Sequence, residues 1–314
     1  MKVCFVGAGS IGKRHIRNLW NIVSRYEDIQ IDLLRSKQCS KTTEIEGFVS
    51  REYYDVESLD ADYDIIFITN PTNLHLKTII DLQKKANSFF VEKPIFDKYE
   101  SKCYLQEIDN SKLYYVACPL RYTNVIKEAK KIVKNCNVFS ARAISSSYLP
   151  DWRSGIDYRN AYSSKKKEGG GVCIDLIHEF DYIISLFGYP EESKMMRGKF
   201  SNLEVDCEDL AVYIASYQDK LVEIHLDYFG KETKRELELF TDQGVYRFDI
   251  INSSITLNGK TIQEYGEDTN DKYIAELNTF LKMVYHNNEN TNDIYQANEV
   301  IRLAESTCWR KSTC

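Results

Sequence analysis

Near its start the chain reads Lys2-Val3-Cys4-Phe5-Val6-Gly7-Ala8-Gly9-Ser10-Ile11-Gly12, an apolar run that leads straight into a glycine-rich turn. A helix-like segment follows and ends near Arg25. A buried strand, a G-x-G-x-x-G turn and a helix in this order are typical of a dinucleotide-binding Rossmann unit. Gly7 would permit the tight turn, Gly9 the approach of a pyrophosphate, and Gly12 close packing of helix and strand. The alternative is a glycine turn of an α/β protein without this ligand.

The start of that helix completes the predicted phosphate site. The first backbone N–H groups of a helix have no partner within the helix and carry a partial positive charge. In this chain they belong to the residues that follow Gly9, namely Ser10, Ile11 and Gly12. We therefore expect these residues, with Gly7 and Gly9, to bind the cofactor.

The composition limits the class of protein. A length of 314 residues suggests two domains, and the net charge of −6 argues against a nucleic-acid partner. The only basic block is Lys165-Lys166-Lys167, which is more simply a solvated charge run than a phosphate site. No apolar run approaches the ~18 residues of a membrane span, and Met1-Lys2 leads into the first strand without a signal peptide. The nine cysteines form no C-x-x-C pair, so we expect reduced core thiols, no metal site and a cytoplasmic protein.

The second strand bears on the choice of cofactor. It covers Asp28 to Arg35, and Arg35 stands where an NAD-binding unit usually carries an acid for the ribose 2′-hydroxyl. A guanidinium at this point suits a 2′-phosphate through charge-assisted hydrogen bonds, and Ser36 follows it. The alternative is that Arg35 is a solvated side chain and Asp32 is the acid, but Asp32 lies inside the strand. We therefore expect NADP, with NAD possible.

Two further strand ends should border the cofactor, because ligands of parallel sheets bind at the carboxyl ends of strands. Asp64 to Thr69 reads as a buried strand before a turn and a helix through Lys85, for which Asn73 is a plausible N-cap. Ser88 to Val91 is the next strand. The cofactor-binding residues expected at these two strand ends are Asn70, Pro71, Thr72, His75, Glu92 and Lys93. Taken alone, His75 fits helix packing as well.

The pattern changes after the strand at Lys112 to Val116, and we place the domain boundary there, with domains at 1–118 and 119–314. A helix is predicted from Asn124 to Lys134. The long alternating runs that follow predict a large, mostly antiparallel open sheet, and they cover 138–148, 210–217, 221–229, 235–240 and 245–250. Among them, Gly169-Gly170-Gly171 leads into a helix on which Asp175 and His178 share a face. Two amphipathic helices, 273–286 and 293–309, end the chain.

Four of these segments, in this order, resemble the glucose-fructose oxidoreductase / inositol dehydrogenase (Gfo/Idh/MocA) family, and the resemblance covers nearly the whole length of the chain. They are Gly7 to Gly12, Asn70 to His75, Glu92-Lys93-Pro94 and Gly169 through Asp181. The resemblance implies an N-terminal Rossmann domain and a C-terminal α/β domain whose open sheet makes homodimer or homotetramer contacts. It also implies that Lys93 is the active-site lysine and that Asp175 and His178 are the site-helix pair. Arg35 departs from the acid of NAD-using members.

The same residues suit hydride transfer to or from a carbinol, whose proton must leave. His178 can act as general base, Lys93 can stabilise negative charge on oxygen, and Asp175 can orient His178 or bind a hydroxyl. Which of Lys93 and His178 is the base stays open. We expect an NAD(P)-dependent oxidoreductase acting on a sugar or nucleotide-linked sugar. The alternatives are a nucleotide-dependent glycosidase or lyase of the same fold and a cofactor-binding sensor without turnover.

A loop rich in aromatic and arginine side chains runs from Tyr148 to Tyr162, just before the glycine run. Such side chains could form a wall for an anionic, ring-bearing substrate, since rings stack and guanidinium groups bind acids. The alternative is a packed surface loop. The substrate-binding residues that we expect are Arg121, Trp152, Tyr158, Arg159 and Tyr162.

Overall fold

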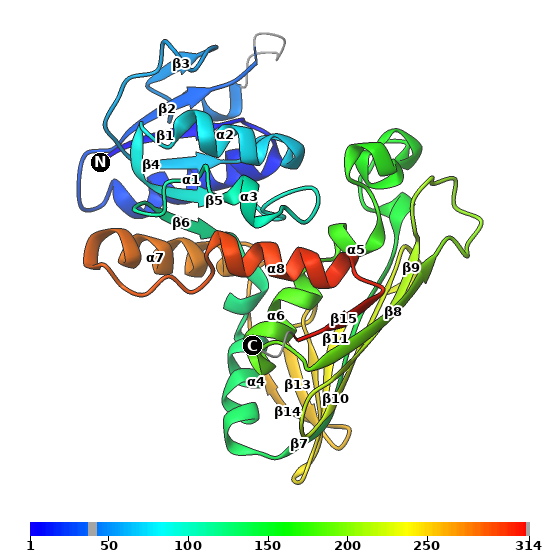
Figure 1. Ribbon diagram of the computed structural model, residues 1–314. Helices are drawn as coiled ribbons and strands as arrows, with labels where there is room; N and C mark the ends of the chain where they lie inside the picture. The colour runs from blue at the N-terminus through cyan, green and yellow to red at the C-terminus, as the bar shows by residue number, and fades with distance from the viewer. Residues whose placement is uncertain (37–42, 312–314) are drawn as a thin grey trace. The chain divides into compact units, whose positions relative to one another are not determined.

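The computed structural model describes residues 1–36 and 43–311, which form two compact units (Figure 1). The first unit contains Met1–Ala117 and, much later in the chain, Tyr273–Asn298. The second contains Cys118–Lys272 and the segment from Glu299 onward. A boundary at residue 118 assigns Tyr273–Asn298 to the second domain, whereas in the structure this stretch packs with the first unit.

The first unit is built on a six-stranded parallel sheet with the strand order β3-β2-β1-β4-β5-β6, the order of a Rossmann fold. The predicted Rossmann domain is therefore confirmed. The strands are β1 Lys2–Val6, β2 Gln30–Leu34, β3 Arg51–Tyr53, β4 Tyr63–Ile68, β5 Ala86–Val91 and β6 Leu113–Val116. The helices are α1 Ser10–Val23, α2 His75–Leu82, α3 Lys102–Leu105, most of α7 Asp271–His286 and the start of α8 Ile294–Glu305.

Aromatic packing joins α7 to this sheet. Phe67 of β4 is fully buried and stacks on Phe5 at 4.4 Å and on Phe90 at 5.0 Å between ring centroids. Phe280 of α7 meets the ring of Phe67 edge-on at 6.0 Å. Such aromatic pairs stabilise a core beyond the area that they bury. The first unit therefore has one core, made from strands near the start of the chain and a helix near its end.

The second unit carries a nine-stranded sheet in the order β14-β13-β12-β11-β7-β10-β9-β8-β15. Only β7 and β10 pair in parallel among its described strands, so the predicted mostly antiparallel open sheet is confirmed. The strands are β7 Val138–Tyr148, β8 Glu192–Gly198, β9 Leu210–Ser216, β10 Leu221–Asp227, β11 Phe229–Thr241, β12 Gly244–Asp249, β13 Ser254–Leu257, β14 Lys260–Glu264 and β15 Cys308–Arg310. The helices are α4 Asn124–Asn135, α5 Val172–Asp175 and α6 His178–Phe187.

The two faces of the nine-stranded sheet differ. Along β10, Val222, Ile224 and Leu226 are buried on the face against which α4 and α6 pack (Figure 1). The alternate residues of β10 point to the other face, because successive side chains of a strand alternate. There the register places exposed Leu221 and Phe240 in one row across the central strands. One face is therefore core, and the other carries apolar side chains at its surface.

Three local expectations were wrong. Asn73 is not an N-cap, because a 3-10 turn at Thr72–Leu74 precedes α2, which ends at Leu82. Asp175 and His178 do not share one helix, since Leu176 leaves helical geometry and separates α5 from α6. The last helix stops at Glu305, and Trp309 lies in β15, which pairs with β8.

The seven cysteines that the structure describes carry free thiols, and their positions correct the expectation that they all belong to the core. Cys103 and Cys308 are exposed, and Cys136 is half-buried. The buried thiols are Cys4, Cys118, Cys173 and Cys207, whereas Cys39 and Cys314 lie outside the described residues. Within 1–36 and 43–311, none of the helices combines the length and the apolar composition that crossing a bilayer requires.

Candidate active site

A cleft of about 960 Å³ opens in the first unit at the carboxyl ends of β1, β2 and β4. Its size is in the range of cofactor sites. Six of the cofactor residues expected from the sequence line it, namely Gly7, Gly9, Arg35, Ser36, Asn70 and Pro71. Tyr54 and Asp55, which follow β3, also line the cleft. Sequence reasoning missed these two because it missed β3.

The turn after β1 depends on glycine, because a Cβ would lie too close to other atoms at two of its three glycines. Gly7 has φ of +92°, and a Cβ there would lie 3.1 Å from the backbone of Asn70. A Cβ on Gly12 would lie 2.7 Å from the carbonyl oxygen of Gly7. A Cβ on Gly9 would meet no atom within 4 Å, so this backbone is open on the cleft side. The turn therefore fits a dinucleotide pyrophosphate, whose approach to the backbone requires this open position.

Other expected cofactor residues do not line the cleft. Ser10, Ile11 and Gly12 begin α1, so their backbone N–H groups, and not their side chains, would meet a phosphate. Thr72, His75, Glu92 and Lys93 lie outside the lining.

His75 has a structural role instead. Its ring is 1 % exposed and lies between backbone carbonyl oxygens, with Nε2 at 3.0 Å from that of Asn70 and Nδ1 at 3.1 Å from that of Pro94. Burial lowers the pKa of this imidazole. His75 thereby joins the turn after β4 to the turn after β5.

Arg35 stands at the tip of β2, as the sequence predicts, and its side chain is only 5 % exposed. Its Nη1 lies 3.4 Å from Oε1 of Glu52 on β3. Asp32, the alternative acid, is fully buried within β2 and accepts a hydrogen bond from the hydroxyl of Tyr63 at 2.9 Å. Asp32 therefore does not face the cleft.

A buried pair supports the Glu92-Lys93-Pro94 turn. Nε2 of His15 on α1 donates to Oε1 of Glu92 at 2.6 Å, and His15 is fully buried. Burial alone would raise the pKa of Glu92, but the hydrogen bond from His15 and the charges of His15 and Lys93 outweigh it and lower that pKa. Oε2 of Glu92 accepts the backbone N–H of Lys93 at 3.2 Å. No spacing in the sequence indicates this link, because His15 and Glu92 lie 77 residues apart.

In the second unit, Asp175 lies in an aromatic cluster. The hydroxyl of Tyr228, which is fully buried between β10 and β11, donates to Oδ2 of Asp175 at 2.7 Å. Partial burial and the neighbouring carboxylate of Asp175 raise the pKa of Tyr162 to about 12. Trp152 meets the ring of Tyr228 edge-on at 5.3 Å. The structure thus brings two of the expected substrate residues, Trp152 and Tyr162, to Asp175, and sequence reasoning missed Tyr228.

The glycine run allows this arrangement. A Cβ on Gly170 would lie 2.4 Å from the carbonyl oxygen of Tyr162. Only glycine therefore lets the backbone at Tyr162 pass directly against the start of α5. His178 begins α6 and is half-buried.

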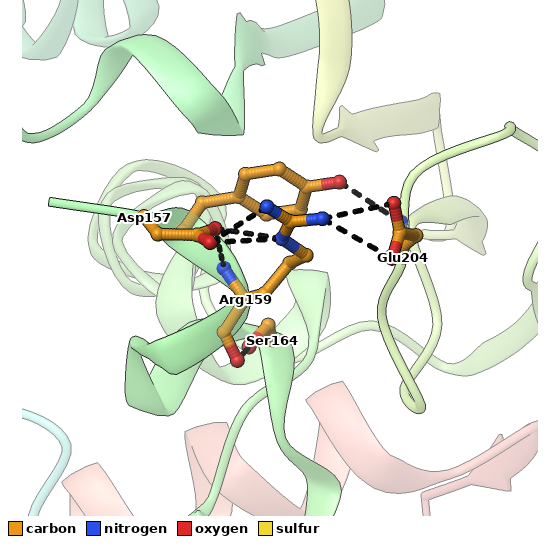
Figure 2. Close-up of polar contacts among 5 residues, drawn as sticks. Asp157, Arg159, Ser164 and Glu204 are labelled. Atoms are coloured by element: carbon orange, nitrogen blue, oxygen red, sulfur yellow. Dashed lines mark hydrogen bonds and ion pairs between the residues drawn. The ribbon is translucent and has the colours of Figure 1, made fainter.

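The other expected substrate residues engage elsewhere in the second unit. Figure 2 shows the guanidinium of Arg159 between Asp157, at 2.7 Å, and Glu204, at 3.3 Å. The hydroxyl of Tyr158 accepts the backbone N–H of Glu204 at 3.0 Å. Arg121 forms a two-pronged ion pair with Asp181 of α6, at 2.6 and 2.8 Å.

Comparison with known families agrees with this geometry. Residues 1–114 match the model of the Gfo/Idh/MocA oxidoreductase family for its NAD-binding Rossmann fold. Residues 151–312 match the model of the same family for its C-terminal alpha/beta domain. The chain belongs to the Gfo/Idh/MocA family. It is therefore an NAD(P)-dependent oxidoreductase, as the sequence predicts.

Individual proteins are also similar to this chain in sequence or in fold. The oxidoreductase YrbE of Bacillus subtilis is 24% identical over 96% of this chain and 92% of its own. Levoglucosan dehydrogenase, solved with NADH and levoglucosan, superposes with a TM-score of 0.83 at 15% identity, over 97% of this chain and 95% of its own. Myo-inositol 2-dehydrogenase from Lactobacillus plantarum gives a TM-score of 0.76 at 16% identity, over 98% and 96%. At these identities the solved structures establish the fold.

The close approach at Gly12 generates the first prediction. Gly12→Ala should weaken NADH binding by about tenfold, or ~1.4 kcal/mol, because the new methyl group displaces the turn at Gly7. Gly47→Ala is the matched control, since a Cβ there meets no atom within 4 Å. Fluorescence titration of each variant measures the affinity. Wild-type affinity in Gly12→Ala would contradict the packing argument.

Proposed function

We propose that the substrate of this oxidoreductase is a sugar or a nucleotide-linked sugar, whose hydroxyl or keto carbon exchanges a hydride with the nicotinamide. The observation that carries the proposal is the cluster around Asp175. Its carboxylate is fixed by Tyr228 beside the rings of Trp152 and Tyr162. Carboxylate oxygens accept hydrogen bonds from hydroxyls, and aromatic faces pack on a sugar ring. Levoglucosan and myo-inositol dehydrogenases among the similar structures agree with such a polyhydroxyl substrate.

In the proposed reaction, Lys93, Asp175 and His178 are the catalytic residues. When bound, the nicotinamide cofactor accepts or gives the hydride. The hydroxyl proton of the carbinol passes to a base, which is either Lys93 or His178. The other group holds the substrate oxygen and stabilises the negative charge that develops on it. Asp175, already hydrogen-bonded to Tyr228, accepts a second substrate hydroxyl and so orients the ring.

The catalytic assignment can be tested by removing the two candidate bases. Lys93→Met and His178→Ala should each lower kcat by about a hundredfold or more, the scale of a positioned acid–base group. NADH affinity should stay near wild type in His178→Ala, because the cleft that fits the dinucleotide lies in the first unit. Turnover of a sugar substrate and fluorescence titration give the two values. Normal turnover of His178→Ala would remove His178 from the mechanism.

For the cofactor we propose a preference for NADP(H), carried by Arg35. Its guanidinium lines the cleft at the tip of β2, and Ser36 follows it in the lining. Guanidinium groups bind phosphate by charge-assisted, forked hydrogen bonds. No acid takes the usual place for a ribose hydroxyl within the described part of β2, since Asp32 is buried against Tyr63.

This preference gives a reversal test. NADPH should bind at least tenfold more tightly than NADH, a difference of ~1.4 kcal/mol, and Arg35→Asp should reverse that order. Arg25→Asp makes the same charge change at an exposed residue beyond the end of α1, outside the cleft lining, and should leave the order unchanged. Both affinities are measured by fluorescence titration. Equal wild-type affinities would rule out the preference.

The loop from 148 to 162 is proposed to contact the substrate at two points of different chemistry. Trp152→Ala should raise KM by roughly tenfold for neutral and phosphorylated sugars alike, because a large aromatic contact is lost. Arg159→Ala should raise KM for a phosphorylated or acidic sugar alone, because only an anion needs the guanidinium. Steady-state kinetics with a matched pair of sugars separates the two effects. An unchanged KM in both variants would make the loop a packed surface segment.

We also propose that the exposed sheet face of the second unit joins subunits into a homodimer or homotetramer. Leu221, Phe240 and Ile214 lie on this face at 55, 38 and 50 % exposure. Contiguous exposed apolar side chains mark association surfaces. Ile214→Lys should lower the molar mass in light scattering to that of the monomer. A wild-type monomer at micromolar concentration would contradict the proposal.

A further inference from the structure

Arg35 is held by an acid of the same chain. Nη1 of Arg35 lies 3.4 Å from Oε1 of Glu52, and the side chain of Glu52 is 35 % exposed, against 5 % for Arg35. The parallel register of β2 and β3 pairs Glu52 with Leu33, two residues before Arg35. The acid therefore reaches Arg35 from the neighbouring strand.

The carboxylate of Glu52 has a second partner that fixes its position. Its Oε2 accepts a hydrogen bond from the hydroxyl of Tyr54 at 3.0 Å, and the guanidinium lies on its other oxygen. This hydrogen bond and the charge of Glu52 raise the pKa of Tyr54. Tyr54 itself lines the cleft together with Arg35, so all three groups lie at the same end of the cofactor cleft. Glu52 is thus a fixed negative charge beside Arg35.

A fixed acid next to the proposed phosphate ligand has a consequence for cofactor choice. A 2′-phosphate at Arg35 must share the guanidinium with Glu52 and is repelled by its carboxylate, since like charges at a few ångströms raise the energy of the complex. A ribose that carries only hydroxyls has no such charge. The same acid therefore opposes NADP(H) and leaves NAD(H) nearly unaffected.

We propose that Glu52 is a specificity-determining residue, whose carboxylate competes with the adenosine 2′-phosphate for Arg35 and limits the preference for NADP(H). This inference rests on the proposed role of Arg35. It adds that an acid from β3 limits the preference for NADP(H). Removal of that charge should raise the ratio of the two affinities without any new contact to the cofactor.

The test is a set of fluorescence titrations with NADPH and NADH on the full chain. Glu52→Gln removes the charge and keeps an acceptor for Arg35, which avoids leaving the guanidinium without a partner. It should tighten NADPH binding by about tenfold and change NADH binding by less than about threefold. Glu57→Gln is the matched control, because Glu57 is an exposed acid in the same segment and does not line the cleft. The ratio of NADPH to NADH affinity in Glu57→Gln should equal that of wild type.

Three further variants separate the possible failures. Glu52→Ala also removes the charge and should raise the NADPH:NADH ratio, which tests the proposal even if Glu52→Gln folds poorly. Glu52→Asp keeps the charge on a shorter side chain and should hold the ratio within about threefold of wild type. Arg35→Gln should weaken NADPH binding alone. If Arg35→Gln leaves the ratio unchanged, the proposed role of Arg35 fails. If Arg35→Gln lowers the ratio but Glu52→Gln does not raise it, the competition by Glu52 is overturned and the role of Arg35 stands.

Discussion

The close approach of α1 to the turn after β1 is the constraint on which the cofactor cleft depends. At Gly12 no side chain separates the helix from the carbonyl oxygen of Gly7. Thr69 at the tip of β4 uses its hydroxyl to donate to that same oxygen at 2.9 Å, and so joins β4 to the turn. The carboxyl ends of β1 and β4 are thereby held next to each other. The cleft is formed where they end, with the tip of β2 beside them.

The local parts of this design could be predicted from the sequence, and the long-range parts could not. The strand, glycine turn and helix at the start of the chain are specified by neighbouring residues. The side chains that support the site find partners far along the chain, with separations of 17 residues for Arg35 and Glu52, 77 for His15 and Glu92, and 53 for Asp175 and Tyr228. No spacing rule covers such pairs. Short strands such as β3 were missed because exposed three-residue strands carry no period.

The loop from 148 to 162 shows how one composition can serve two purposes. Trp152 packs on Tyr228 beside Asp175, whereas Arg159 is held by Asp157 and Glu204. From the sequence alone, Trp152 and Arg159 are equally good candidates for substrate contact. Gly170 brings the end of the loop, at Tyr162, against the backbone just before α5. The partners that each side chain meets in the fold, and not its residue type, therefore separate the two roles.

Because Tyr273–Asn298 packs with the first unit, a single cut in the chain does not separate the two units. A fragment that ends near residue 118 would contain the six strands and the glycine turn, but not α7. Its sheet would expose the side of Phe67 that Phe280 covers, and the hydroxyl of Tyr115 would lose its buried acceptor, Glu276, at 3.0 Å. Unlike a Rossmann domain that is continuous in sequence, this one is not obtained whole by truncating the chain. A permuted gene that joins the late segment to the early one would be needed to obtain the cofactor-binding unit by itself.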